Sequence, residues 1–282
     1  MAPTGGGVAG FAGLMMLASG MIHAVVNAIL KSGQDKMSSR ALIDGFSALI
    51  VLPFAFFLPL PHGAWGWLAS STMIHLVYLL ALIKAFEHGD MSVAYPIARG
   101  VAPVLAASVA VVAFSEHLTV WTAIGVGAVS VGVLVVGLGR HIDRRTLGWA
   151  VLTGVCIAGY TVVDAQGVRA APNAASYIVW GFLALGGLIG GLFAVWRGPR
   201  FILAARSEWR PGLIAGALSI VTYGLALWAL RLGETPRLAA LRETSILFGL
   251  IIAVVFLKER LTPSRLVGVG AIAVGAVVLL AS

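Results

Sequence analysis

The stretch GVGAVSVGV at residues 125–133 recurs as GVGAIAVGA at residues 268–276, at an offset of 143 positions (268 minus 125). The segments before the two copies match at the same offset, as FSEHLT at 114–119 and LKERLT at 257–262. Self-similarity at a fixed offset is the sequence signature of a repeated structural unit. The chain is therefore predicted to contain two related halves.

Two further pairs of segments keep the same order along the chain, with small changes of offset that need only short insertions. We place the first half at residues 1–143 and the second half at residues 144–282. The additional pairs are HAVVNA at 23–28 with YTVVDA at 160–165, and YLLAL at 78–82 with YGLAL at 223–227.

The composition is that of a membrane protein. The 282 residues are 60% hydrophobic and 11% charged, with a mean hydropathy of +0.99, whereas soluble domains carry about 25% charged residues. A helix needs roughly 20 apolar residues to cross the hydrocarbon core. By this rule we predict an all-α integral membrane protein with ten transmembrane helices, at residues 8–30, 40–60, 65–86, 91–114, 118–139, 146–167, 174–196, 210–231, 236–257 and 262–281.

Each predicted half holds five of these helices. Because five is odd, the second half enters the membrane from the opposite side, so the two repeats are inverted. Inverted repeats around a binding site near the middle of the bilayer are a common plan of secondary transporters. We therefore expect alternating access to a central cavity.

The positive charges predict an orientation. Of the 19 Lys and Arg residues, 14 lie in the odd-numbered connections, 3 in the even-numbered connections and 2 inside predicted helices. Cytoplasmic loops carry the excess of positive charge, so both termini are predicted to lie outside the cytoplasm. This distribution also explains the isoelectric point of about 10.3 without nucleic acid as a partner. The single cysteine, Cys156, excludes an internal disulfide and a multi-cysteine metal site.

Arg99 and Arg242 lie inside predicted helices and are 143 positions apart, so they are equivalent residues of the two halves. A charged side chain at membrane depth costs at least a few kcal/mol and normally faces a cavity or a partner. Arg99 is expected to contact substrate, because no acid is evident at its depth. For Arg242 two roles stay open: substrate contact, or a structural pair with Asp164 or with a backbone carbonyl.

Other polar residues fall near these arginines. Asn27 and Asp164 occupy matching positions late in their helices, and Glu243 either lies in the cavity or meets Arg99 across the pseudo-twofold axis. Packing alone could explain the histidines and tyrosines, which are the other candidates for the substrate site. They are His23, His75, Tyr78, Tyr160 and Tyr223.

Pro96 and Pro103 flank Arg99 in the helix predicted at 91–114. Each removes one backbone hydrogen bond and bends a helix, so they form either a packing bend or a hinge beside the site. Their equivalents in the second half are Ala239 and Ile246, so the predicted kink belongs to the first half alone.

Glycines seven positions apart mark one face of the fifth and tenth helices: Gly125 with Gly132, and Gly268 with Gly275. Small residues let helix backbones approach closely. These two helices are predicted to pack on each other as a scaffold away from the cavity.

Motifs for other chemistries are missing. The chain has no Walker A, GxSxG, HExxH or CxxC sequence, so nothing indicates ATP hydrolysis, hydrolytic catalysis or a metal centre, and no cofactor is expected.

The motifs resemble the EamA type of the drug/metabolite transporter superfamily. The resemblance rests on SEHLT with GVGAVSVG, KERLT with GVGAIAVG, HAVVNAILK at 23–31 and DMSVAYPIARGVAP at 90–103. It implies a basket in which helices 1, 3, 4, 6, 8 and 9 line a cavity and helices 5 and 10 lie behind. Bacterial members include amino-acid exporters of the YddG type. Ten-helix members are usually drawn with both termini inside, whereas the charges here predict them outside.

The small multidrug-resistance branch of that superfamily carries an essential glutamate in its first helix. Here the first and sixth helices carry Asn27 and Asp164 instead. This departure argues against proton-driven export of lipophilic cations.

Together these features predict an exporter of amino acids or similar small zwitterions in the bacterial inner membrane. Its partners would be a small-molecule substrate and the lipid bilayer, and it would work as a monomer. An alternative is a transporter or exchanger of anionic metabolites such as sugar phosphates, which needs several cationic groups around one cavity. An intramembrane enzyme would need a nucleophile or a metal cluster, and a bare scaffold would have no use for buried charges.

Overall fold

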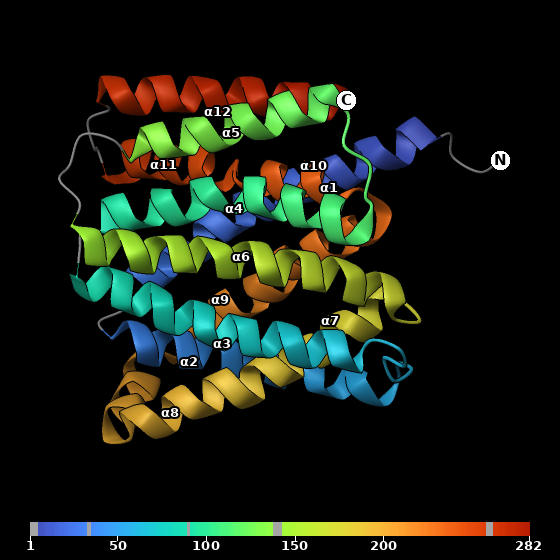
Figure 1. Cartoon of the computed structure of the whole chain (residues 1–282). Helices are drawn as coiled ribbons and strands as arrows, with labels where there is room; N and C mark the ends of the chain where they lie inside the picture. Colours follow the sequence, from blue (N-terminus) through green and yellow to red (C-terminus); the bar gives the residue numbers. More distant parts are fainter. Residues whose placement is uncertain (1–4, 33–34, 89–90, 138–142, 258–261) are drawn as a thin grey trace.

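The computed structural model describes residues 5–32, 35–88, 91–137, 143–257 and 262–282. Every regular element in these ranges is helical, as predicted, and the helices run back and forth through one bundle (Figure 1). In chain order they are α1 (Gly5–Ser32), α2 (Lys36–Val51) with the 3₁₀ turn η1 (Leu52–Phe56), α3 (Trp65–His88), α4 (Met91–Phe114), α5 (Val120–Val136), α6 (Arg144–Ala170), α7 (Ala174–Leu185) with the π-helical turn η2 (Gly186–Gly190), α8 (Gly191–Arg197), α9 (Pro199–Leu232), α10 (Thr235–Arg242), α11 (Ser245–Leu257) and α12 (Pro263–Ala281).

These elements form the ten membrane segments that the apolar runs predict. Within the described residues, eight helical segments are long and apolar enough to cross a bilayer. The other two are α5, which is a shorter apolar helix, and the pair α10 and α11, which divide the ninth segment between them. The start of α1 and the end of α12 lie at the same end of the bundle (Figure 1).

The largest difference from the predicted boundaries is at α9. Helix α9 begins at Pro199, so residues 199–209, predicted as part of a connection, are helical. Proline suits a first helical position because its missing N–H has no partner there in any case. Hydropathy reports only the part of a helix that lies in hydrocarbon, which is why the polar extension escaped the prediction.

The interrupted segment is not the expected one. Helix α4 continues through Pro96 and Pro103, whereas the ninth segment, predicted as one helix, breaks between α10 and α11. At the break the amide of Glu243 donates to Ala240 and that of Thr244 to Leu241, which are the tighter i to i−3 bonds of a 3₁₀ turn. The kink predicted from Pro96 and Pro103 concerned the first half alone, and the break in the second half is a separate feature that the sequence did not predict.

Helix α1 passes close to this break. A Cβ atom at Gly20 would lie 3.3 Å from both the backbone nitrogen of Ser245 and the hydroxyl of Thr244. The Thr244 hydroxyl donates to the carbonyl of Leu241 at 2.7 Å. Threonine side chains that bond to the backbone in this way compete with regular helix, and glycine leaves the space in which the turn can form.

The glycine faces of α5 and α12 meet as predicted, at one edge of the bundle (Figure 1). A Cβ atom at Gly132 would lie 2.7 Å from the carbonyl oxygen of Gly268, and one at Gly268 would lie 2.6 Å from that of Gly132. Gly125 and Gly275 abut each other's carbonyl oxygens in the same way, at 3.2 and 2.9 Å. The two helices therefore touch backbone to backbone, and the predicted scaffold is confirmed.

A polar network joins four segments at the end of the bundle that holds both termini. Glu116, just after α4, accepts from Nη1 of Arg169 at 2.6 Å and from the backbone nitrogen of Thr235 at 2.7 Å. Arg169 in turn donates to the carbonyls of Leu230 and Gly233, at 3.0 and 2.7 Å. The network fixes the start of α10 against the ends of α4, α6 and α9.

At the opposite end, Asp35 forms an ion pair with Arg197, which donates to it through Nε at 2.8 Å and also through Nη2. The hydroxyl of Ser38 donates to the same carboxylate at 2.6 Å. Hydrogen bonding to Arg197 lowers the pKa of Asp35 to about 2. This pair joins the turn before α2 to the end of α8.

Candidate functional site

The two equivalent arginines have different surroundings. Nε of Arg99 lies 2.7 Å from Oε2 of Glu243, and both side chains are almost completely buried. Neither atom has an aligned hydrogen-bond partner, so this contact is an ion pair and not a directed hydrogen bond. Nη2 of Arg99 donates to the hydroxyl of Ser245 at 2.8 Å. Of the two places left open for Glu243, the structure has it beside Arg99, so an acid does lie at the depth of Arg99, contrary to the expectation for that arginine.

Among the described residues no carboxylate forms an ion pair with Arg242, although Arg242 is only 8% exposed. Its Cζ lies 5.2 Å from the centroid of the Tyr223 ring, and its Nε has no hydrogen-bond partner. The pair with Asp164 that we left open is not formed, because the carboxylate of Asp164 is occupied by tyrosines. The guanidinium of Arg242 is therefore available to an anionic group.

Asp164 is 2% exposed and accepts two phenolic hydrogen bonds. Tyr177 donates to Oδ1 at 2.8 Å, and Tyr223 donates to Oδ2. The ring of Tyr177 lies against Gly167, where a Cβ atom would come within 2.4 Å of its hydroxyl. A glycine one turn after Asp164 thus makes room for the tyrosine that binds it.

Four of the predicted site residues form one aromatic cluster. The ring of His75 stacks on that of Tyr160, with centroids 4.0 Å apart, and meets Tyr78 and Tyr223 edge-on at 6.3 and 6.0 Å. Nδ1 of His75 lies 2.9 Å from the carbonyl oxygen of Ser71. Since a carbonyl only accepts, Nδ1 carries the proton.

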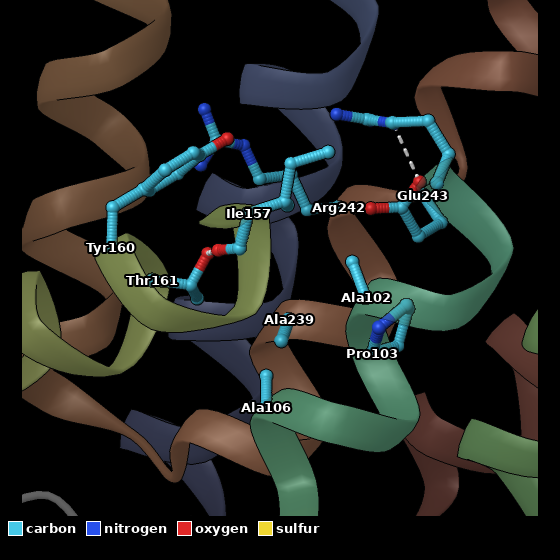
Figure 2. A pocket seen from close by; sticks show the side chains of 10 residues that line it. Ala102, Pro103, Ala106, Ile157, Tyr160, Thr161, Ala239, Arg242 and Glu243 are labelled. Atoms are coloured by element: carbon cyan, nitrogen blue, oxygen red, sulfur yellow. Dashed lines mark hydrogen bonds and ion pairs between the residues drawn. The ribbon is translucent and has the colours of Figure 1, made fainter. Parts of the chain in front are cut away.

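The charged residues line a first hollow between α4, α6 and α10. Figure 2 shows Ala102, Pro103 and Ala106 of α4 on one side and residues of α6 on the other. Its volume is about 10 Å³, which is about the space that one water needs. The residues around it are Arg99, Ala102, Pro103, Ala106, Ile157, Tyr160, Thr161, Ala239, Arg242 and Glu243.

A second hollow of about 10 Å³ lies between α3, α6, α7 and α9. Asp164, Tyr177 and Tyr223 line it, together with the hydroxyl-bearing Ser71 and Thr72. The seventh segment, which the resemblance placed outside the cavity wall, therefore contributes to it through α7. An amino acid is larger than either hollow, so neither can hold a whole amino acid with the side chains in these positions.

Three of the remaining predicted residues, His23, Asn27 and Pro96, are not among those that line the two hollows. Nδ2 of Asn27 donates to the hydroxyl of Tyr95 at 3.4 Å, and His23 lies one helical turn earlier on α1. Pro96 packs against the end of α5, where a Cβ atom at Gly137 would come within 2.8 Å of it. Pro103 lines the first hollow. Of the two predicted hinge prolines, Pro96 therefore belongs to the contact with α5 and Pro103 to the wall of the first hollow.

Sequence reasoning missed three residues that contact the predicted ones: Tyr95, Tyr177 and Ser245. Tyr95 was within reach of prediction, because it precedes Arg99 by four positions and so shares its helix face. Cζ of Arg99 lies 5.8 Å from the centroid of that ring. Tyr177 and Ser245 meet the site only through tertiary packing and gave no local signal.

Comparison with known proteins supports a transporter. Residues 144–281 match the model of the EamA-like transporter family, a family of transporters and not of enzymes. A solved structure titled only "Crystal structure of protein" aligns with a TM-score of 0.69 and 15% sequence identity, over 96% of this chain and 95% of that chain. At this identity the likeness concerns the fold alone. No curated protein matches the chain.

Proposed function

We propose, because residues 144–281 match the model of the EamA-like transporter family, that the chain is a secondary transporter that exports amino acids or similar small zwitterions. In this proposal the protein resides in the bacterial inner membrane with both termini outside, and one chain is the working unit. Its two inverted five-helix repeats, residues 1–143 and 144–282, would rock around the buried charges to expose them alternately to each side. The proposal includes similarity in function to amino-acid exporters of the YddG type, which the sequence motifs resemble.

The balance of buried charge is the observation that supports a zwitterion. The charged side chains that line the two hollows are Arg99, Arg242, Glu243 and Asp164, two of each sign. A site of zero net charge accepts a zwitterion without leaving an uncompensated ion at membrane depth, where such an ion costs several kcal/mol.

Within this set Arg242 is the residue that would bind the substrate carboxylate. Its guanidinium has no anionic partner, whereas Arg99 is engaged by Glu243 and Ser245. A guanidinium and a carboxylate form paired, charge-assisted hydrogen bonds. His75, Tyr78 and Tyr160 would supply the apolar and hydrogen-bonding wall beside it.

A transport assay with the full chain in proteoliposomes tests the proposal. Vesicles loaded with one unlabelled amino acid should accumulate the same labelled amino acid by counterflow. Arg242→Gln should reduce the rate by about 10-fold or more, since a hydrogen bond to a charged group contributes roughly 1.5–3 kcal/mol. Arg265→Gln, a change outside the two hollows, is the matched control and should retain counterflow. Absence of counterflow with every standard amino acid would refute the proposal.

A second candidate has one supporting observation. Arg99 and Arg242 both line the first hollow, and two guanidinium groups at one place also suit an anionic metabolite such as a sugar phosphate. Glu243 forms an ion pair with Arg99 and so offsets one of the two positive charges. In the same vesicles, competition by organophosphates but not by amino acids would favour this candidate.

A further inference from the structure

Helix α9 is longer than a membrane crossing requires. It holds 34 residues, about 51 Å at 1.5 Å per residue, whereas the hydrocarbon core is about 30 Å thick. Apart from Arg231 near its other end, its charged side chains all precede Pro211. Residues 199–210 are therefore the part of α9 that lies outside the hydrocarbon.

This segment, residues 199–210, crosses the start of α2. Phe201 packs against the apolar cluster that contains Ala41 of α2, and Glu208 accepts a hydrogen bond from the hydroxyl of Ser39 at 2.6 Å. The two contacts on α2 are two positions apart, about 3 Å along its axis, whereas the two contacts on α9 are seven positions apart, about 10 Å. The segment thus lies across the first turns of α2 and not alongside them.

The chain just before α9 marks the level of the membrane interface. Helix α8 lies at the end of the bundle opposite the two termini (Figure 1), and its Trp196 is 63% exposed. Tryptophan at the end of an apolar segment is typical of the interface between hydrocarbon and headgroups. Gly198, with a φ of +51°, then turns the chain directly into α9. The 199–210 segment therefore starts at the interface and lies along it.

The open face of this segment mixes cationic and apolar side chains. Arg206 and Arg210 are exposed and are neighbours on the helix surface, since they are four positions apart. Ile202, Leu203 and Trp209 are 54%, 65% and 45% exposed and lie on both sides of the arginines on the same half of the helix. Such a face suits a bilayer surface, where apolar side chains enter the boundary of the acyl chains and guanidinium groups reach the phosphates.

The acidic residue of the segment does not neutralise this face. Glu208 is half-buried and turned toward Ser39. Among the described residues, no carboxylate forms an ion pair with Arg206 or Arg210. Cζ of Arg210 lies 5.2 Å from the centroid of the Trp209 ring. Both guanidinium charges are thus free to bind an anionic group outside the protein.

We propose that Arg206, Trp209 and Arg210 form a binding site for the headgroup of an acidic phospholipid, with Ile202 and Leu203 against the acyl chains. A guanidinium binds phosphate oxygens through paired, charge-assisted hydrogen bonds, and basic residues beside the membrane attract anionic lipids. The exposed apolar side chains beside the arginines favour a lipid over a soluble acidic protein. This site is separate from the two hollows, so the inference does not depend on what is transported.

Displacement of brominated lipid around the full chain in vesicles tests this inference. Ile214→Cys, in a Cys156→Ser background, carries a bimane probe one turn beyond Arg210, at a position that is 55% exposed. Brominated phosphatidylcholine quenches the probe, and unbrominated lipid that replaces it restores the fluorescence. Phosphatidylglycerol should compete at least about fivefold more strongly than phosphatidylcholine with the same chains, since one basic residue near anionic headgroups contributes roughly that factor.

Matched variants assign the preference to the two arginines. Arg206→Gln and Arg210→Gln should each lower it, and together they should bring it close to one. Arg145→Gln, which removes an exposed arginine in the first turn of α6, is the control and should leave it unchanged. A bimane at Val274→Cys, 62% exposed on α12, should report little preference. These side chains lie on the surface, so the variants should fold.

Three results would overturn the inference: equal competition by the two lipids at position 214, the same preference at position 274, or a preference that survives the loss of both arginines. Soluble poly-glutamate that binds this face and removes the lipid preference would assign it to an acidic protein, which also overturns the lipid site. Counterflow in the same vesicles is a separate readout, so a failure of the proposed transport function leaves the lipid result unaffected.

Discussion

Arg99 and Arg242 occupy equivalent positions in the predicted sequence repeat but have different partners. Arg99 is held by Glu243 and by the hydroxyl of Ser245, while Arg242 lies over Tyr223 and has no ion pair with a carboxylate of the described residues. Arg99 is thus held by an ion pair and a hydrogen bond, whereas the guanidinium of Arg242 can still bind an anionic group. The difference arises at Glu243, where the ninth segment leaves regular helix and the carboxylate turns toward α4.

The Arg99–Glu243 pair should be expensive to break from one side only. Arg99→Met or Glu243→Gln, each alone, leaves a buried charge uncompensated and should lower the free energy of unfolding by about 3–5 kcal/mol. The double variant should lose much less than the sum of the two single losses. Unfolding titrations in detergent measure all three, and strictly additive losses would contradict the pairing.

Asp35 provides a pH-dependent contribution outside the membrane. Its pKa is lowered from the ordinary value of 3.8 to about 2, first of all by hydrogen bonding to Arg197. A lowered pKa means that the native state favours the ionised form. The contribution is therefore fully present above pH 3.8 and is lost as the pH falls through about 2.

Asp35→Asn should consequently lower the unfolding temperature at neutral pH. The difference from the wild type should stay constant down to about pH 4 and shrink below it, since both proteins then lack the ionised carboxylate. Thermal unfolding in detergent over a pH series checks this. Asp143→Asn, which removes the capping carboxylate at the start of α6, tests whether any acidic residue would give the same profile.

At the scale of elements, the close packing of α5 on α12 is the feature that substitution can probe most directly. Gly132→Ala places a methyl group 2.7 Å from the carbonyl oxygen of Gly268, a backbone atom that cannot move aside alone. We expect loss of stability of at least about 1–3 kcal/mol, the usual range for overpacking. Gly127→Ala, on the same helix with nothing within 4 Å, should be neutral or gain up to about 1 kcal/mol.

Unfolding titrations of the two alanine variants therefore give opposite signs if the helices pack as described. Equal effects at both positions would indicate that helix propensity, and not contact with α12, governs this face.

The elements were predictable to different extents for physical reasons. Membrane segments were found because the length of an apolar run is fixed by bilayer thickness, and the α5–α12 contact was found because glycine spacing is local. The break after Arg242 was missed because it depends on Gly20 of another helix passing by. Likewise, the choice of Tyr177 as a partner of Asp164 depends on the packing of α7 against α6. Two residues that meet only in the folded bundle leave no periodic trace in the sequence.

At the scale of the whole molecule, polar contacts join the helices at both ends of the bundle, and both hollows are too small for an amino acid. The Glu116 network fixes the start of α10 at the end where the termini lie, and α10 carries Arg242 and Glu243 at its other end. Opening toward that end therefore requires α10 to leave Glu116. Movement of one short helix would then change access to the charged site.

Glu116→Ala should shift the protein toward a state open at that end. In a Cys156→Ser background, which removes the single cysteine, Ala239→Cys places a thiol in the wall of the first hollow. Its modification by a membrane-impermeant maleimide added outside intact cells should be several-fold faster with Glu116→Ala than without it. With the predicted orientation, an unchanged rate would contradict a gating role for the network, and Glu208→Ala at the opposite end is the control.

The glycine at position 20 has a consequence for how such a protein can vary. It touches neither hollow, yet the break that positions Glu243 depends on the space it leaves beside Thr244 and Ser245. A larger residue there would stiffen the wall without altering any group that meets the substrate. We therefore expect substitutions at Gly20 to alter the rate of the proposed transport more than its choice of substrate.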